Sequence, residues 1–414
     1  MKVTRWAVAA VVGLTVAIMP FQAPAHATTT QVIVQGGTTI RDSGLLANVI
    51  TPGFQAAYPQ YTLTFVAVGT GQALINAEAG QGDAVFTHNP AAEADFVAGG
   101  FSNEPYGRAV MVSDFITVGT NGDAAGVNAA APHQAVKAFK TIAAAGASGI
   151  ADFVSRGDAS GTNLKELQIW ALTGIPLNVN GEPGTPGTTD TASWYHKAGV
   201  GQAAMLSITN QCNFSSHHCY TLVDRGTFNY LAGQSPSTVA NLSLVSDRND
   251  APALGGPSLL VNPYHAYAVK PGTTPATVNI DGAMAFLDYL TSPAFQTAVA
   301  NYPSASAPAF TPDARPKITI TKKLPARAPL GTTISMAGTV RPNFPLSPQL
   351  TGAPVQLVRS GAPNNPVATD RLSSKGRYQF TFKARQSDDY TVVFPQYQDR
   401  RSTSLLAGHL RVTG

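Results

Sequence analysis

Three short segments rich in glycine, serine and threonine give the strongest chemical signal in this sequence. They are residues 38–39, 69–71 and 155–162. The second and third are each expected to follow a strand and to open a helix, and the first precedes Asp42-Ser43-Gly44 and a helix. At such strand-to-helix junctions free backbone N–H groups, hydroxyl donors and the positive end of the helix dipole meet. Such junctions hold anions, although serine, threonine and aspartate at these positions can also do no more than cap the helix. Three junctions in one domain favour an anion site.

Two arginines add positive charge to these junctions. Arg156 lies inside the third segment, and Arg225 lies in a fourth, residues 224–227. A guanidinium makes paired, charge-assisted hydrogen bonds to oxyanions, so Arg156 is the expected principal charged donor. Arg225 either shares this role or only caps its helix. The candidate ligand-binding residues are Thr38, Thr39, Gly69, Thr70, Gly71, Ser155, Arg156, Ser160, Gly161, Thr162 and Arg225.

The chain carries no recognisable catalytic or cofactor motif. The patterns GxSxG, HExxH and GxxxxGK[ST] are absent. Residues 157–161 (GDASG) resemble a serine-protease nucleophile loop, but an alanine separates the aspartate from the serine. Residues 68–74 (VGTGQAL) begin a dinucleotide-binding fingerprint and then have leucine where it needs a third glycine or alanine. We therefore expect neither an enzyme nor a cofactor.

The chain has two cysteines, Cys212 and Cys219, close together in the sequence. In an oxidising compartment such a pair most often closes a small loop, which predicts a disulfide. With His217 and His218 the same residues could form a zinc site. Adjacent histidines beside a cysteine do not easily all face one tetrahedral metal, so the disulfide is favoured and no protein-bound metal is expected.

The junctions must be positioned by the elements around them, and these alternate between strands and helices from residue 28 to residue 302. Such alternation predicts mostly parallel sheets covered by helices. Because this length is large for one sheet, we expect two α/β lobes. Residues 177–193 form a Gly/Pro/Thr-rich insertion that is typical of a surface loop.

The pattern changes after residue 302. Residues 303–316 (PSASAPAFTPDARP) predict a stiff, extended Pro/Ala/Ser linker rather than a packed segment. Residues 317–414 contain seven short runs of alternating apolar and polar residues, separated by Gly, Pro and Asn turns. This spacing predicts an all-β sandwich of immunoglobulin-like architecture.

Residues 1–27 are expected to be a signal peptide. A basic start with Lys2 and Arg5 precedes an apolar run at 6–19, and Ala25-His26-Ala27 has the small-x-small pattern of a cleavage site. The run is shorter than the roughly 20 residues that span a bilayer. Both cysteines lie far downstream, so a lipid anchor is not expected. The sequence predicts a secreted or envelope protein without a lipid.

Charge divides the chain into two unlike parts. Residues 28–314 hold 10 Lys and Arg against 19 Asp and Glu, a net charge of −9. Residues 315–414 hold 15 against 4, a net charge of +11. An anion bound by the acidic part must be held by local, desolvated donors, which enclosure between two lobes would provide. The low charged fraction, 12%, argues against a nucleic-acid partner.

Several blocks of this sequence resemble the tungstate-binding proteins of bacterial ABC transporters, over residues 30–302. They are TTxxDSGLL at 38–46, AVGTGQAL at 67–74, GDAVFTHNPAAE at 82–93, FVSRGDASGT at 153–162, TLVDRGTF at 221–228 and GAMAFLDYLTSP at 282–293. The resemblance implies a two-lobed type II periplasmic-binding-protein fold with a hinge, a tungstate site in the cleft and delivery to a membrane permease.

Most of the candidate residues match positions of the family's motifs. Thr38 and Thr39 match the last two positions of the family's TTTS block, while Gly37 stands where threonine is usual. The remaining matches are Gly69, Thr70, Gly71, Ser155, Arg156, Ser160 and Thr162.

Three functions stay open at this point. Tungstate, molybdate and sulfate carry no proton at neutral pH and need only donors, whereas phosphate keeps a proton and needs one acceptor. Asp42 or Asp158 could supply that acceptor, unless helix N–H groups or Arg156 already occupy them, which we favour. Alternatively, the α/β part has lost binding, and the protein is an adhesion or envelope protein that acts through its basic C-terminal part. In a solute-binding protein, the same basic part is expected to hold the chain at an anionic envelope surface, wall polymer or acidic lipid, by charge attraction. That part could equally serve solubility and spacing.

Overall fold

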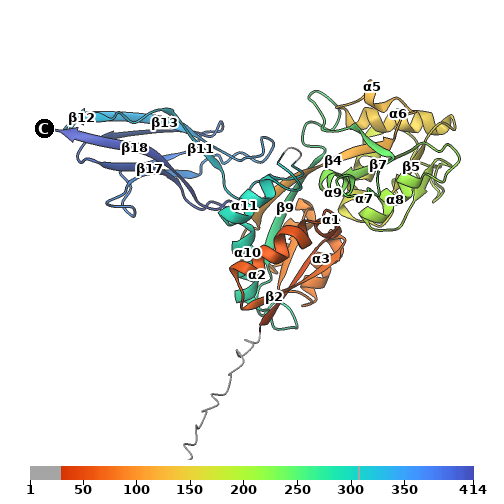
Figure 1. Ribbon diagram of the computed structural model, residues 1–414, viewed down its shortest axis with the longest axis horizontal. Coiled ribbons are helices and arrows are strands. Elements are labelled where there is room, and N and C mark those ends of the chain that lie inside the picture. Colours follow the sequence, from red (N-terminus) through yellow and green to blue (C-terminus); the bar gives the residue numbers. More distant parts are fainter. Residues whose placement is uncertain (1–28, 306–307) are drawn as a thin grey trace, which may run out of the picture.

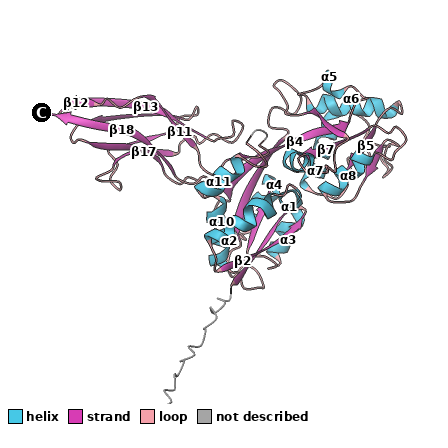
Figure 2. Ribbon diagram, in the orientation of Figure 1, coloured by secondary structure: helices cyan, strands magenta, loops and turns pink. Residues whose placement is uncertain are grey.

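The computed structural model describes residues 29–305 and 308–414. Two α/β lobes and a C-terminal β domain follow one another along the chain (Figure 1). The second lobe and the β domain extend from different sides of the first lobe, and helices cover the sheets of both lobes (Figure 2). The expected signal peptide lies outside the described residues. No helix in the described part of the chain is long and apolar enough to cross a membrane.

The first lobe is built on strands in the order β2-β1-β3-β9-β4, with the two neighbours of β1 parallel to it. Its strands are β1 (Thr30–Gly37), β2 (Tyr61–Val68), β3 (Ala84–Thr87), β9 (Val261–Ala268) and the first half of β4 (Arg108–Thr120). Its helices are α1 (Thr38–Asp42), the π-helix η1 (Leu46–Ile50), α2 (Thr51–Ala57), α3 (Thr70–Glu78), α4 (Pro90–Ala98), α10 (Ile280–Leu290) and α11 (Pro293–Ala300).

The second lobe contains the second half of β4 and has its own apolar core around Trp170 and Phe153. Its other strands are β5 (Asp152–Ser155), β6 (Tyr195–Lys197), β7 (Cys219–Asp224) and β8 (Leu242–Ser246). Its helices are α5 (Val127–Ala130), α6 (Ala135–Ala147), α7 (Gly161–Thr173), α8 (Gln202–Gln211) and α9 (Arg225–Ala232).

Strand β4 runs through both lobes and forms half of the hinge between them. Its residues Arg108 to Asp114 pair with β9, and from Phe115 onward it pairs with β7. The chain returns to the first lobe beside it, where the Phe115 N–H donates to the Leu260 carbonyl at 2.8 Å. Each lobe has apolar clusters of its own, and two adjacent backbone crossings join the lobes.

The expectation of two α/β lobes is confirmed, but the expectation of mostly parallel sheets is wrong. Within the described part of the two lobes, the parallel pairs are β1·β2, β1·β3, β5·β6 and β5·β7. The pairs β3·β9, β4·β9, β4·β7 and β4·β8 are antiparallel. The reason is the double crossing, because a chain that leaves one lobe on β4 and returns on β9 must run in opposite directions along these two strands.

The segment expected to be an unpacked linker is packed in its second half. Phe310 and Ala314 are buried, and β10 (Thr311–Pro312) pairs antiparallel with Met111 and Val112 of β4. The Pro, Ala and Ser content predicted an unpacked segment, but the large apolar side chain of Phe310 lies in the core of the first lobe.

The C-terminal domain consists of two sheets that share one apolar core. The three-stranded sheet has the order β11-β13-β16 and the five-stranded sheet the order β12-β18-β17-β14-β15. The strands are β11 (Lys317–Lys322), β12 (Arg327–Pro329), β13 (Thr333–Arg341), β14 (Pro354–Arg359), β15 (Ala368–Arg371), β16 (Arg377–Lys383), β17 (Asp388–Phe394) and β18 (Thr403–Thr413). All seven expected strands are present, and the short β12 was missed.

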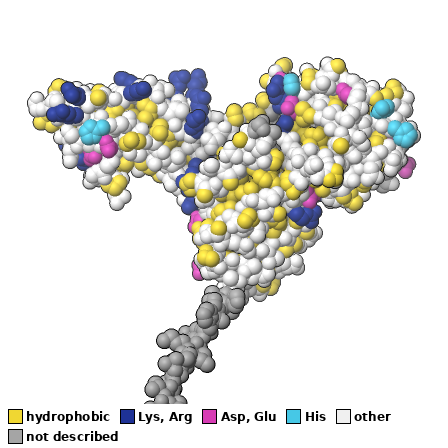
Figure 3. Space-filling view, in the orientation of Figure 1, with side chains coloured by type: hydrophobic (Ala, Val, Ile, Leu, Met, Phe, Trp, Pro, Cys, Tyr) yellow, Lys and Arg dark blue, Asp and Glu magenta, His cyan; other side chains and the backbone are white. Residues whose placement is uncertain are grey.

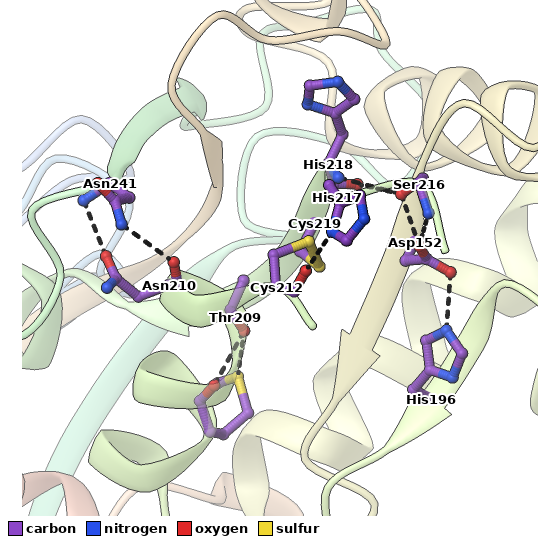
Figure 4. Close-up of a disulfide and its surroundings, with 11 residues drawn as sticks. Asp152, His196, Thr209, Asn210, Cys212, Ser216, His217, His218, Cys219 and Asn241 are labelled. Carbon is purple, nitrogen blue, oxygen red and sulfur yellow. Dashed lines mark hydrogen bonds and ion pairs between the residues drawn. A yellow bond between two sulfur atoms is a disulfide. The ribbon is translucent and has the colours of Figure 1, made fainter. Parts of the chain in front are cut away.

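The disulfide between Cys212 and Cys219 is formed, with a Cα–Cα distance of 5.6 Å (Figure 4). The loop that it closes is held by Asp152, whose carboxylate accepts from the Ser216 N–H at 3.1 Å and lies 2.7 Å from His196 Nε2. Both sulfur atoms are used in this bond, so they are not available as zinc ligands. No cluster of three metal-ligating side chains occurs within residues 29–305 and 308–414.

Candidate functional site

Helices α1 and α3 of the first lobe and α7 of the second lobe begin at the same place. A Cβ on Gly37, before α1, would lie 3.9 Å from Thr70 Oγ1 at the start of α3. A Cβ on Gly69 would lie 3.8 Å from Cα of Ser160, the residue before α7. The three junctions singled out in the sequence therefore meet across the boundary between the lobes.

The starts of α1 and α3 keep their hydrogen-bond donors free of side-chain caps. The N-cap residues are Gly37 and Gly69, and neither helix has a side-chain cap. The first N–H groups of a helix have no partner within the helix, so they remain for an external acceptor. Thr70 is 1% exposed, and its hydroxyl has no hydrogen-bond partner. Burying such a group without a partner is costly, and the Thr70 hydroxyl is therefore a donor available to an acceptor at the start of α3.

Arg156 reaches the same group of residues from the end of β5. Its side chain is 2% exposed, its Nη2 pairs with Asp158, and its Nη1 lies 3.4 Å from Thr38 Oγ1. The Nε–H is buried and has no partner. The guanidinium is thus anchored at one end and keeps a charged donor unused.

Two expected ligand residues turn inward instead. The Ser155 hydroxyl donates to Glu166 at 2.7 Å and accepts from the Gly157 N–H at 3.1 Å. The Thr162 hydroxyl donates to Gln202 Oε1 at 2.7 Å. Both side chains therefore brace the second lobe. Burial raises the pKa of Glu166 to about 7, because desolvation outweighs the hydrogen bonds that it accepts.

Gln202 was missed by the sequence analysis and links the junctions of the second lobe. Its Nε2 donates to Thr227 Oγ1 at 3.1 Å, which turns its Oε1 toward Thr162 and Arg156. It is fully buried at the start of α8. No local pattern marks it, because its partners come from α7, α9 and the end of β5.

The two aspartates that could accept a proton from phosphate are both engaged. The Asp158 carboxylate pairs with Arg156 and accepts from the Ser160 N–H at 3.2 Å. The Asp42 carboxylate pairs with Arg41 at 2.8 Å and accepts from the Ala203 N–H at 3.4 Å. This agrees with the preference for occupied carboxylates stated above.

Arg225 lies outside this group. Its guanidinium binds Asp114 through Nε at 2.6 Å and Nη2 at 2.7 Å, and it contacts Asp247 at 3.1 Å. These carboxylates raise its pKa against the opposing effect of burial. The structure thus places Arg225 beside the hinge residue Asp114, with Nε and Nη2 bound to carboxylates, rather than with Thr38, Thr70 and Ser160.

His88 was also missed, and it lies between the junctions. It directly follows β3, the strand next to β1, which is the positional signal that could have identified it. Its side chain adjoins a cavity of about 330 Å³ that is lined from both lobes by residues including Asn262, Gly161 and Lys165. Burial lowers the pKa of His88 to about 4, so the ring is neutral at pH 7.

Two α/β lobes joined by a hinge, with helix N-termini from both lobes meeting at the cleft, define a type II periplasmic-binding protein. The chain belongs to this family of binding proteins, since the PBP superfamily domain (PBP_like_2) matches residues 23–294.

Three individual proteins show which members of this family the chain is similar to. The chain is 31% identical to the tungstate-binding protein TupA of Peptoclostridium acidaminophilum, over 68% of this chain and 86% of that protein. It is 36% identical to a candidate ABC-transporter anion-binding protein of Haloferax volcanii, over 67% and 70%. A crystal structure described as the tungstate ABC transporter from Geobacter sulfurreducens is similar with a TM-score of 0.51 and 34% identity, over 66% of this chain and 98% of that one.

Proposed function

We propose that this protein captures tungstate or molybdate between its lobes and delivers the anion to an ABC permease. One observation carries the proposal: two buried donors, the Thr70 hydroxyl and Arg156 Nε, lack partners where three helix N-termini meet. The proposed ligand contacts are Thr38, Thr70, Ser160, Arg156 and the N–H groups at the start of α1, α3 and α7. In this proposal Thr39, Ser155, Thr162 and the flanking glycines shape the site.

The supply of donors favours an anion that only accepts hydrogen bonds. Asp42 and Asp158, the nearby acceptors, already bind Arg41 and Arg156. Neither carboxylate is a free acceptor for the proton of hydrogen phosphate. Tungstate and molybdate need no acceptor, and the names of the TupA relatives agree with this choice.

A thermal-shift series with tungstate, molybdate, sulfate and phosphate tests the proposal. A ligand that binds only the folded state adds about 4 kcal/mol of stability at 1,000 times its Kd. We expect large shifts with tungstate or molybdate and small shifts with the other two anions. A clear shift with phosphate and none with tungstate or molybdate would mean that the anion class is wrong.

For the C-terminal domain we propose a tether to an anionic envelope polymer or lipid, and an immunoglobulin-like classification of its two sheets. Figure 3 shows groups of Lys and Arg side chains on this domain, and Lys322 and Lys323 are exposed. Arg400 does not belong to this surface, since it is buried in an ion pair with Asp313 at 2.6 Å. With a cleaved signal peptide and no lipid, such a domain would retain the binding protein at the cell.

The tether is tested by binding of the full chain to purified envelope at two salt concentrations. Charge attraction weakens as the screening length falls from about 10 Å at 0.1 M to about 3 Å at 1 M. Lys322→Glu with Lys323→Glu should reduce retention at low salt. The matched control, Lys137→Glu with Lys140→Glu, changes two exposed lysines of the second lobe and should bind normally. Equal retention of both variants at both salt concentrations would exclude the tether.

A further inference from the structure

His88 lies between the two lobes with one ring nitrogen directed at the proposed anion site. A Cβ on Gly37, before α1, would lie 2.9 Å from its Nε2. A Cβ on Gly161, the first residue of α7, would lie 2.8 Å from its Cε1. The imidazole therefore fills the space between the starts of a first-lobe helix and a second-lobe helix. It can do so because both neighbours are glycines.

The hydrogen bonds around Asn262 fix which nitrogen of His88 carries the hydrogen. The amide Nδ2 of Asn262 donates to the buried carboxylate of Asp224 at 2.9 Å, so its Oδ1 is the atom that faces His88. That oxygen lies 3.0 Å from His88 Nδ1 and can only accept. Nδ1 therefore carries the hydrogen, and Nε2 of the neutral ring presents a lone pair toward Gly37 and Thr70.

A lone pair at this place opposes an anion that has no proton of its own. A fully deprotonated oxyanion offers only acceptor oxygens, so it meets neutral Nε2 as acceptor against acceptor. Adding a proton to Nε2 converts this nitrogen into a charged donor and the contact into an attractive one.

From this geometry, and resting on the function proposed above, we infer that His88 takes up one proton when a tetrahedral dianion binds and becomes a charged ligand to it. Nε2 gains a proton from solvent, the Nδ1–H bond to Asn262 is kept, and no covalent bond to the anion forms. A fully deprotonated oxyanion then binds at His88 together with one proton from solvent. Hydrogen phosphate, which brings its own proton, would bind the neutral ring without proton uptake.

The charges around His88 support such a switch. In the free protein burial is the main cause that holds the pKa of His88 down, and Arg156 lowers it further. Glu93 on α4 acts in the opposite direction, but its charge is shared with His265 at 3.0 Å. Asp224 of β7 reaches the ring through Asn262, and the neutral ring of Tyr264 on β9 lies with its centroid 4.9 Å away. An arriving dianion adds negative charge on the Nε2 side, which raises the pKa.

Calorimetric titration with molybdate at pH 7 to 8.5, in buffers of different ionisation enthalpy, measures the protons taken up. We expect about one proton for each anion bound, and a Kd that rises up to tenfold for each pH unit in this range. His88→Gln places a neutral amide donor at the position of Nε2. It should still bind molybdate, with no proton uptake and a flat pH profile. The matched control His409→Gln changes an exposed histidine of the C-terminal domain and should behave as the parent chain.

The possible outcomes separate the inference that His88 takes up a proton from the proposed binding of an oxyanion. Binding by the parent chain without proton uptake, or equal uptake by His88→Gln, overturns the inference and leaves the proposed function standing. No binding of any oxyanion overturns both. If His88→Gln does not fold, ¹⁵N spectra of the parent chain's histidine rings decide. One ring should change from neutral to imidazolium on adding molybdate, and no change in any ring would overturn the inference.

Discussion

Replacing Arg156 by alanine removes the only guanidinium that the structure brings to the three helix N-termini among residues 29–305 and 308–414. The side chain is 2% exposed, and its unpartnered Nε–H is the charged donor available to an anion. The variant therefore tests whether the site is where we have placed it.

The expected loss follows from the surroundings of Arg156. Truncating one partner of a buried, hydrogen-bonded charge pair costs about 2 to 5 kcal/mol. Asp158 already neutralises part of this charge, so the lower half of that range applies. A loss of about 2 to 3 kcal/mol weakens binding roughly 30-fold to 150-fold. The free protein should lose little stability, because Asp158 is 21% exposed and its carboxylate can be hydrated after the change.

Calorimetric titration of Arg156→Ala with tungstate and molybdate measures the loss, and a thermal melt without anion measures the stability. Arg248→Ala is the matched control, since Arg248 also pairs with an aspartate two residues later, Asp250, at 2.9 Å, but is largely exposed. It should bind as the parent chain does. Parental affinity in Arg156→Ala would show that this arginine is structural and that the cleft is assigned wrongly.

Three further changes test other parts of the account. Thr70→Val should cost about 1.5 to 3 kcal/mol of anion affinity, as for the loss of a hydrogen bond to a charged group. The melting temperature of the free protein should not fall, because the hydroxyl has no partner there. A large drop in melting temperature would contradict this. His265 lies between Glu93 and Asp399 of the C-terminal domain, and these carboxylates raise its pKa to about 9 despite burial. The charged histidine therefore contributes up to about 3 kcal/mol to the free energy of unfolding below about pH 6.5, and this contribution is lost as the pH rises through 9. In urea unfolding between pH 7 and 9.5, the free energy of unfolding of His265→Gln should fall less than that of the parent chain. Replacing Cys212 and Cys219 together by serine should lower the free energy of unfolding by about 2 kcal/mol and leave the Kd unchanged; a weaker affinity would mean that the disulfide loop influences the site.

Local sequence patterns were sufficient to locate the junctions but not to assign roles within them. Residues 69–71 and 155–162 each open a helix as expected, because glycine, serine and threonine favour such turns wherever they occur. Residues 38–39 also open a helix, α1, which begins earlier than the helix expected from residue 44. Which hydroxyls face the ligand depends on partners from other elements. Ser155 and Thr162 turn toward Glu166 and Gln202, and neither partner could be paired with them from spacing alone.

The same reason explains why the sequence did not show the surroundings of Arg225 or the position of His88. Arg225 has the sequence context of an anion ligand, but the double crossing between the lobes brings Asp114 to it. His88 stands in an unremarkable strand end until β1 and α7 place Gly37 and Gly161 on both sides of its ring. The double crossing also sets the directions of β4 and β9. A short stretch of sequence does not show where the chain crosses between the lobes.

The central claim is that this chain binds a tetrahedral oxyanion that only accepts hydrogen bonds. Calorimetric titration of the anion-free mature protein with tungstate, molybdate, sulfate and phosphate at neutral pH tests it most directly. The account predicts that tungstate or molybdate binds at least about tenfold more tightly than sulfate or phosphate, a difference of about 1.4 kcal/mol or more. Tighter binding of phosphate, with no heat from tungstate or molybdate, would contradict it.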